Sequence, residues 1–177
     1  LSNNTKIKKL SYAASFGEDT WSHSSEVTTK VSNLIAKFNG ISVREDTSID
    51  LCKDHFGMNA IHHVDPTMLL TPEDYIKLMI NEKEPQPKDD ILVYMLDINK
   101  DRQKTIDAVC NYFKCNYFSV NVKSINVNDA LEDRIYPTVT SWLKGFKEAK
   151  FIVTDSFHGS VFSILFNKPF VAYGNVG

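Results

Sequence analysis

The chain has 177 residues, 42% hydrophobic and 24% charged, which is the composition of a globular protein with a buried core. A net charge of -2 without a Lys/Arg-rich stretch predicts that it does not bind nucleic acid. Its three cysteines form no disulfide framework, and no window has the length of a membrane span or the pattern of a signal peptide. We therefore expect a cytoplasmic protein. Because the chain opens without Met and stops just after a predicted strand, we also expect it to be incomplete at both ends.

Strand-like and helix-like segments alternate through the first 80 residues. Residues 8–14 read as a strand that ends in the turn Ser15-Phe16-Gly17. Apolar residues at spacings of three and four then predict a helix ending at Asn39-Gly40. A strand at 41–44, a helix at 47–56 closed by Gly57 and a strand at 61–64 follow. The helix that begins after residue 71 has an N-cap threonine and a proline in its first turn.

The same alternation restarts after residues 81–90, which contain no apolar residue apart from two prolines. This composition is typical of a linker. Strands are predicted at 91–96, 117–122, 151–154 and 169–173, and helices at 100–113, 138–148 and after residue 156. The pattern predicts an α/β fold of parallel sheets flanked by helices, with one domain in residues 1–80, a linker in 81–90 and a second domain in 91–177.

The segment 151–166 combines an apolar strand, a polar turn and a helical repeat. The turn carries Asp155, Ser156, His158 and Gly159. In parallel α/β folds ligands bind beyond the carboxyl ends of the strands, and helix N-termini bind anions through backbone N–H groups. These residues are therefore expected to face a ligand.

Four motifs, at residues 11–17, 41–45, 64–67 and 154–162, occur in an order that resembles the polysaccharide pyruvyl transferase family, from about Lys9 to Gly174. The resemblance implies a GT-B-like fold, in which two Rossmann-like domains face a cleft. Residues 1–80 would then be the C-terminal part of the first domain and residues 91–177 most of the second. It also implies transfer of a pyruvyl group from phosphoenolpyruvate onto two hydroxyls of a saccharide or lipid-linked oligosaccharide, forming a cyclic ketal. Phosphoenolpyruvate would be a substrate, no separate cofactor is expected, and a lipid-linked acceptor would bring peripheral membrane association.

This chemistry needs a proton carrier and groups that hold anions. His158 is the expected general acid/base, with a capping or core histidine as the alternative. Asp155 is expected to orient His158 or the substrate, or else to cap the helix. Gly159 and Ser160 are expected to present N–H groups to the substrate. Ser156 stands where some family members carry an arginine that grips phosphoenolpyruvate.

Arg44, at the end of a predicted strand, is expected to supply the missing positive charge, because its guanidinium can bind a carboxylate or phosphate through two N–H groups. An ion pair with Glu45 or Asp46 is its alternative role. Ser15, Gly17 and Asp65 complete the expected substrate-binding residues.

No metal site is predicted, because the adjacent His62 and His63 would point to opposite faces of a strand. Two other functions remain open on the sequence alone. One is a GT-B glycosyltransferase that uses a nucleotide sugar, and the other is a non-catalytic carbohydrate-binding or assembly subunit.

Overall fold

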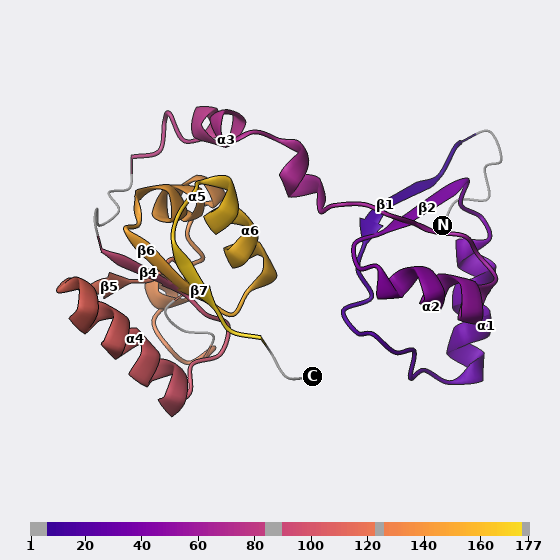
Figure 1. Cartoon of the computed structure of the whole chain (residues 1–177), viewed down its shortest axis with the longest axis horizontal. Helices are drawn as coiled ribbons and strands as arrows, with labels where there is room; N and C mark the ends of the chain where they lie inside the picture. The colour runs from indigo at the N-terminus through magenta and orange to yellow at the C-terminus, as the bar shows by residue number, and fades with distance from the viewer. Residues whose placement is uncertain (1–6, 84–89, 123–125, 175–177) are drawn as a thin grey trace. The chain divides into compact units, whose positions relative to one another are not determined.

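The computed structural model describes residues 7–83, 90–122 and 126–174. The chain divides into two compact units, with residues up to 69 in the first and residues from 70 onward in the second. Figure 1 labels most of the helices and strands of both units. Each unit contains its own parallel sheet, so the predicted α/β class is confirmed.

The first unit has a three-stranded parallel sheet in the order β1-β2-β3, formed by Leu10–Ala14, Gly40–Val43 and Ile61–His62. Helix α1 (Ser25–Ile35) connects β1 to β2, and α2 (Thr47–Phe56) connects β2 to β3. The short 3-10 helix η1 (Pro66–Leu69) follows β3. Gly57 ends α2 in a left-handed conformation with φ 63°, which glycine adopts without steric strain. The buried apolar residues of this unit come mainly from β2 and α2.

The second unit has a four-stranded parallel sheet in the order β5-β4-β6-β7. The strands are β4 (Ile91–Tyr94), β5 (Tyr117–Phe118), β6 (Phe151–Thr154) and β7 (Phe170–Ala172). The helices are α3 (Pro72–Leu78), α4 (Lys100–Phe113), the 3-10 helix η2 (Leu131–Arg134), α5 (Val139–Glu148) and α6 (Phe157–Leu165). Helix α4 lies on one face of the sheet, whereas α5 and α6 lie on the other (Figure 1).

Alternate residues of the central strands supply the two cores of the second unit. Leu92 and Ile152 pack under α5 and α6, whereas Ile91, Val93 and Val153 pack under α4. All five are fully or almost fully buried. A strand covered on both faces has no polar alternation, which is why β4 and β6 read as continuous apolar runs.

Helix α3 packs with the second unit. Tyr75 in the middle of α3 and Met79 just beyond its end belong to the core cluster that contains Leu92 and Phe162. The Tyr75 and Phe162 ring centroids are 5.0 Å apart. Part of the expected linker at 81–90 lies outside the described residues, so a boundary there stays a prediction.

Two strands have half the predicted length or less, whereas those predicted at 8–14, 91–96 and 169–173 are each two residues shorter than expected. The segment 61–64 pairs only through Ile61 and His62, and the segment 117–122 only through Tyr117 and Phe118. Both are edge strands, so each has a partner on one side only. The residues beyond β5 are used differently, because Val120 enters the core and Asn121 bonds to the loop after β4.

Candidate functional site

The turn after β6 brings α6 unusually close to the sheet. The Thr154 hydroxyl donates to the Tyr94 carbonyl oxygen at 2.7 Å and accepts from the Ser156 N–H at 3.1 Å. A Cβ at Gly159 would lie 2.1 Å from the Thr154 Oγ1 and 2.9 Å from its Cβ. Position 159 therefore has no room for a side chain, and the glycine allows the first turn of α6 to rest on Thr154.

Ser156 is the N-cap of α6. Its hydroxyl accepts a hydrogen bond from the Gly159 N–H at 3.4 Å, and the Ser160 hydroxyl donates to the Ser156 carbonyl oxygen at 3.3 Å. Three residues expected to bind substrate thus share the first turn of this helix. The cap satisfies one of the N–H groups that a helix start leaves without an intrahelical partner.

Asp155 anchors the loop that follows β4. Its side chain is 1% exposed, and its two oxygens accept from the N–H groups of Leu96 at 2.7 Å and Asp97 at 3.2 Å. The Arg102 guanidinium donates to the same carboxylate at 2.7 Å. The structure therefore uses Asp155 to join β6, the loop after β4 and α4.

Arg102 is a residue that the sequence-based prediction missed. It lies in the first turn of α4, behind the N-cap Asn99, and its side chain is 12% exposed. The helix dipole favours acidic residues at the N-terminus of a helix. An arginine in this first turn was therefore the signal in the sequence that could have pointed to a specific partner. The guanidinium also lies 5.7 Å from the centroid of the Tyr173 ring and 3.5 Å from an Asp97 carboxylate oxygen.

His158 is exposed, as is the adjacent Phe157, whereas Asp155 and Gly159 are buried. It lies in the first turn of α6, and its ring meets the Phe157 ring edge-on at a centroid distance of 5.3 Å. The exposure excludes the alternative of a core histidine. Solvent and ligands can therefore reach the imidazole.

In the first unit, the expected residues Ser15, Gly17 and Arg44 meet at the carboxyl ends of β1 and β2. The Ser15 hydroxyl donates to Glu45 Oε1 at 2.8 Å and accepts from the Gly17 N–H at 3.0 Å. The same Glu45 oxygen accepts from Arg44 Nε at 3.0 Å. The ion pair between Arg44 and Glu45, expected as one role of this arginine, is confirmed.

The network continues to Asp65, the last residue of the loop that joins β3 to η1. Arg44 donates to Asp65 Oδ2 at 3.2 Å, and Asp65 Oδ1 accepts from the backbone N–H and the hydroxyl of Thr67 at 2.9 and 2.7 Å. The Asp65 side chain is 6% exposed and that of Arg44 20%. All four residues proposed in this unit are thus brought together, and Glu45 links them although it was not itself proposed.

The environment of Glu45 determines its charge. Burial alone would raise the pKa of Glu45, but hydrogen bonds from Ser15 and Arg44 and the guanidinium charge outweigh burial and lower this pKa below its usual value. Glu45 is therefore ionised near neutral pH and balances part of the Arg44 charge.

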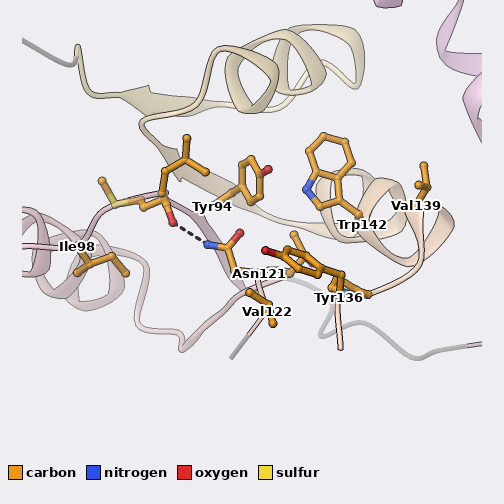
Figure 2. A pocket seen from close by; sticks show the side chains of 11 residues that line it. Tyr94, Ile98, Asn121, Val122, Tyr136, Val139 and Trp142 are labelled. Carbon is orange, nitrogen blue, oxygen red and sulfur yellow. Dashed lines mark hydrogen bonds between the residues drawn. The ribbon is translucent and has the colours of Figure 1, made fainter. Parts of the chain in front are cut away.

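A pocket of about 700 Å³ lies in the second unit, where β4 and β5 end (Figure 2). The Asn121 amide donates to the Met95 carbonyl oxygen at 2.7 Å and so connects the two loops that border it. Sequence reasoning did not find this pocket, because its residues come from segments distant in the chain. They are Tyr94, Met95, Leu96, Ile98, Val120, Asn121, Val122, Tyr136, Pro137, Val139 and Trp142.

Within residues 7–83, 90–122 and 126–174, no group of three or more His, Cys, Asp or Glu side chains is placed to hold a metal ion. No helix in this part of the chain is long and apolar enough to cross a membrane.

Parallel α/β units with polar side chains at the carboxyl ends of their strands are a common framework of enzymes. The model of one family, described as polysaccharide pyruvyl transferase, matches residues 2–175, and the chain belongs to that family. The family resemblance seen in the sequence is thereby confirmed, and the chain is a transferase whose family acts on polysaccharides. A comparison with curated proteins finds no match.

Proposed function

We propose that the protein transfers the pyruvyl group of phosphoenolpyruvate onto two hydroxyls of one sugar in a surface polysaccharide or exopolysaccharide, forming a cyclic ketal. The observation that carries this proposal is the exposed His158 in the first turn of α6, within the family motif. Its neighbours Asp155 and Ser156 are engaged in bonds that hold the turn, so His158 is the titratable side chain of the turn that a substrate can reach.

Ketal formation requires a residue that can both donate and accept protons. A proton adds to the methylene carbon of phosphoenolpyruvate, and the positive charge that develops on the adjacent carbon is attacked by the first sugar hydroxyl. Phosphate then leaves, and the second hydroxyl attacks the same carbon. One hydroxyl proton replaces the proton added to the methylene carbon, and the other leaves with phosphate. In the proposal, His158 delivers and collects these protons, because an imidazole titrates near neutral pH.

The donor carries a phosphate and a carboxylate, so the site also needs cations. Arg44 is one candidate, and it would act from the first unit in a GT-B arrangement whose two Rossmann-like units face a cleft. Arg102 is the second candidate, because it lies at the same sheet edge as the His158 turn and already binds a carboxylate, that of Asp155. Either arginine could bind an anion through two N–H groups. Gly17 and the first turn of α6 would add backbone N–H groups.

The experiment is to incubate the protein with phosphoenolpyruvate and neutral or lipid-linked oligosaccharides, and to follow phosphate release and the mass of the acceptor. We expect His158→Ala to abolish transfer while circular dichroism and thermal unfolding stay unchanged. His55→Ala, which alters an exposed histidine of α2, is the matched control and should retain activity. Transfer that survives in His158→Ala would exclude the proton-carrier role.

Two outcomes would favour another function. Thermal stabilisation by nucleotide sugars, with none by phosphoenolpyruvate, would indicate a glycosyltransferase. Saccharide binding without turnover of either donor would indicate a carbohydrate-binding or assembly subunit. A cytoplasmic location, with membrane association through a lipid-linked acceptor, belongs to the same proposal.

A further inference from the structure

Among the described residues, those that line the pocket between the ends of β4 and β5 include no charged side chain. Phosphoenolpyruvate is a multiply charged anion, and burying its charges without a cation would be strongly unfavourable. A nucleotide diphosphate meets the same objection. We infer that this pocket binds an uncharged sugar ring of the acceptor; calling that sugar an acceptor rests on the proposed function.

Unused hydrogen-bonding groups in the pocket support a polar but neutral ligand. Within the described part of the chain, the hydroxyls of Tyr94 and Tyr136 and the indole N–H of Trp142 make no hydrogen bond. In Figure 2 these groups and the Asn121 amide oxygen face the space between the labelled side chains. Three donors and an acceptor around one space match the hydroxyls of a sugar better than a purely apolar molecule.

Aromatic rings supply the other half of sugar recognition. A pyranose has faces of C–H groups that pack on an aromatic ring, while its hydroxyls bond at the edges, and Tyr and Trp combine an apolar ring with a polar group. Trp142 is held rigidly, with ring centroids 5.3 Å from Tyr94 and 4.4 Å from Phe146. Tyr136 is 71% exposed and forms the accessible side. The volume lies within the range of about 300–1,000 Å³ that is usual for ligand pockets.

The test compares Tyr136→Ala with Tyr112→Ala, an equally simple change at a tyrosine of α4 that is 81% exposed and outside the pocket. Titration calorimetry without any donor would measure binding of neutral oligosaccharides of galactose, glucose and mannose. We expect at least one series to bind the unchanged protein, with affinity reduced about tenfold by Tyr136→Ala, which corresponds to about 1.4 kcal/mol. Tyr112→Ala should bind as the unchanged protein does. Tyr94→Phe, which removes only a hydroxyl, should weaken binding by a smaller factor.

Three results would overturn the inference: no binding of any series, equal affinities of the Tyr136→Ala and Tyr112→Ala proteins, or loss of phosphoenolpyruvate binding in Tyr136→Ala. The experiments also distinguish a failure of this inference from a failure of the proposed function. Saccharide binding that depends on Tyr136, without turnover of phosphoenolpyruvate, would leave the pocket assignment standing and exclude the pyruvyl transfer. Turnover with an acceptor Michaelis constant unaffected by Tyr136→Ala would support the pyruvyl transfer and exclude the pocket assignment.

Discussion

The carboxylate of Asp155 joins the turn after β6 to the loop after β4 and the start of α4, which lie 53 to 59 positions earlier in the sequence. It accepts hydrogen bonds from two backbone N–H groups after β4 and from Arg102 in α4. A buried charge of this kind is retained only where such partners compensate it. Asp155 therefore holds the shape of the sheet edge on which His158 and the proposed sugar pocket both depend.

Removing this anchor should reduce stability strongly. We expect Asp155→Ala to lower the free energy of unfolding by about 2–4 kcal/mol, because it leaves two N–H groups and a guanidinium without their acceptor. Asp97→Asn is the matched control, since Asp97 also pairs with Arg102 but its side chain is 77% exposed. It should change stability by less than about 1 kcal/mol. Urea denaturation measures both, and equal losses would contradict the anchoring role.

Glu45 makes the stability of the first unit depend on pH. Because its pKa is lowered in the folded protein, its contribution is complete above the unfolded pKa of about 4.3 and is lost as pH falls through the lower, folded pKa. Glu45→Gln should therefore be less stable than the unchanged protein near neutral pH, and the difference should shrink in acid. Urea denaturation of both proteins across this pH range is the measurement, with Glu18→Gln, at an exposed position, as control. A difference that does not vary with pH would refute this explanation.

At the scale of single elements, the packing of α6 on β6 depends on the missing side chain of Gly159. Gly159→Ala would press a methyl group against the buried Thr154. We expect it to destabilise the protein by about 1–3 kcal/mol or more, as overpacking does. Gly174→Ala, where a Cβ would meet nothing within 4 Å, should have little effect. Thermal unfolding compares the two variants, and similar melting temperatures would show that α6 can move away from β6 at little cost.

Local rules explain how much of the fold was predictable. The bounds of α2 and α4 follow from caps and apolar spacing, the N-cap Thr71 marks the start of α3 as expected, and α5 starts one residue after the predicted position. The edge strands β3 and β5 were overestimated most, because an apolar or β-branched run does not show where a partner strand ends. The length of a strand depends on both paired segments, so the sequence of one segment alone does not determine it.

The candidate site, like the fold, could be predicted only in part. His158, Asp155 and Ser156 were found because they share one short motif, and Arg44 because it ends a strand. Arg102 was missed, since its contact with Asp155 spans 53 positions of the sequence. The pocket was missed for a similar reason, because Tyr94, Asn121 and Trp142 meet only after the sheet has formed. Spacing along a chain does not report contacts of this length.

At the scale of the whole molecule, the two units have cores of unequal size. Among the described residues, five buried apolar side chains belong to the first unit and fifteen to the second. Helix α1 contributes none. Since buried apolar surface is the main source of stability, the first unit should be the less stable of the two.

Calorimetry should therefore show two unfolding transitions, the first from the smaller unit. Leu51→Ala should lower the temperature of the first transition alone, and Ile106→Ala that of the second alone, because each leucine or isoleucine truncation in a core removes about 2–5 kcal/mol. Leu51 lies in α2 and Ile106 in α4, each buried within its own unit. A single transition shifted equally by both substitutions would show that the units unfold together.

The order of strands in the second sheet also bears on synthesis of the chain. Strand β4 pairs with β6 from Ile91↔Phe151 to Tyr94↔Thr154, about sixty positions further along. During translation β4 emerges long before this neighbour, with Ile91, Leu92 and Val93 destined for complete burial. Contacts between distant positions form slowly, and exposed apolar strands tend to associate with other chains. Between the appearance of β4 and that of β6 the nascent chain is thus at its most vulnerable to aggregation, and chaperones that shield apolar segments would act in that interval.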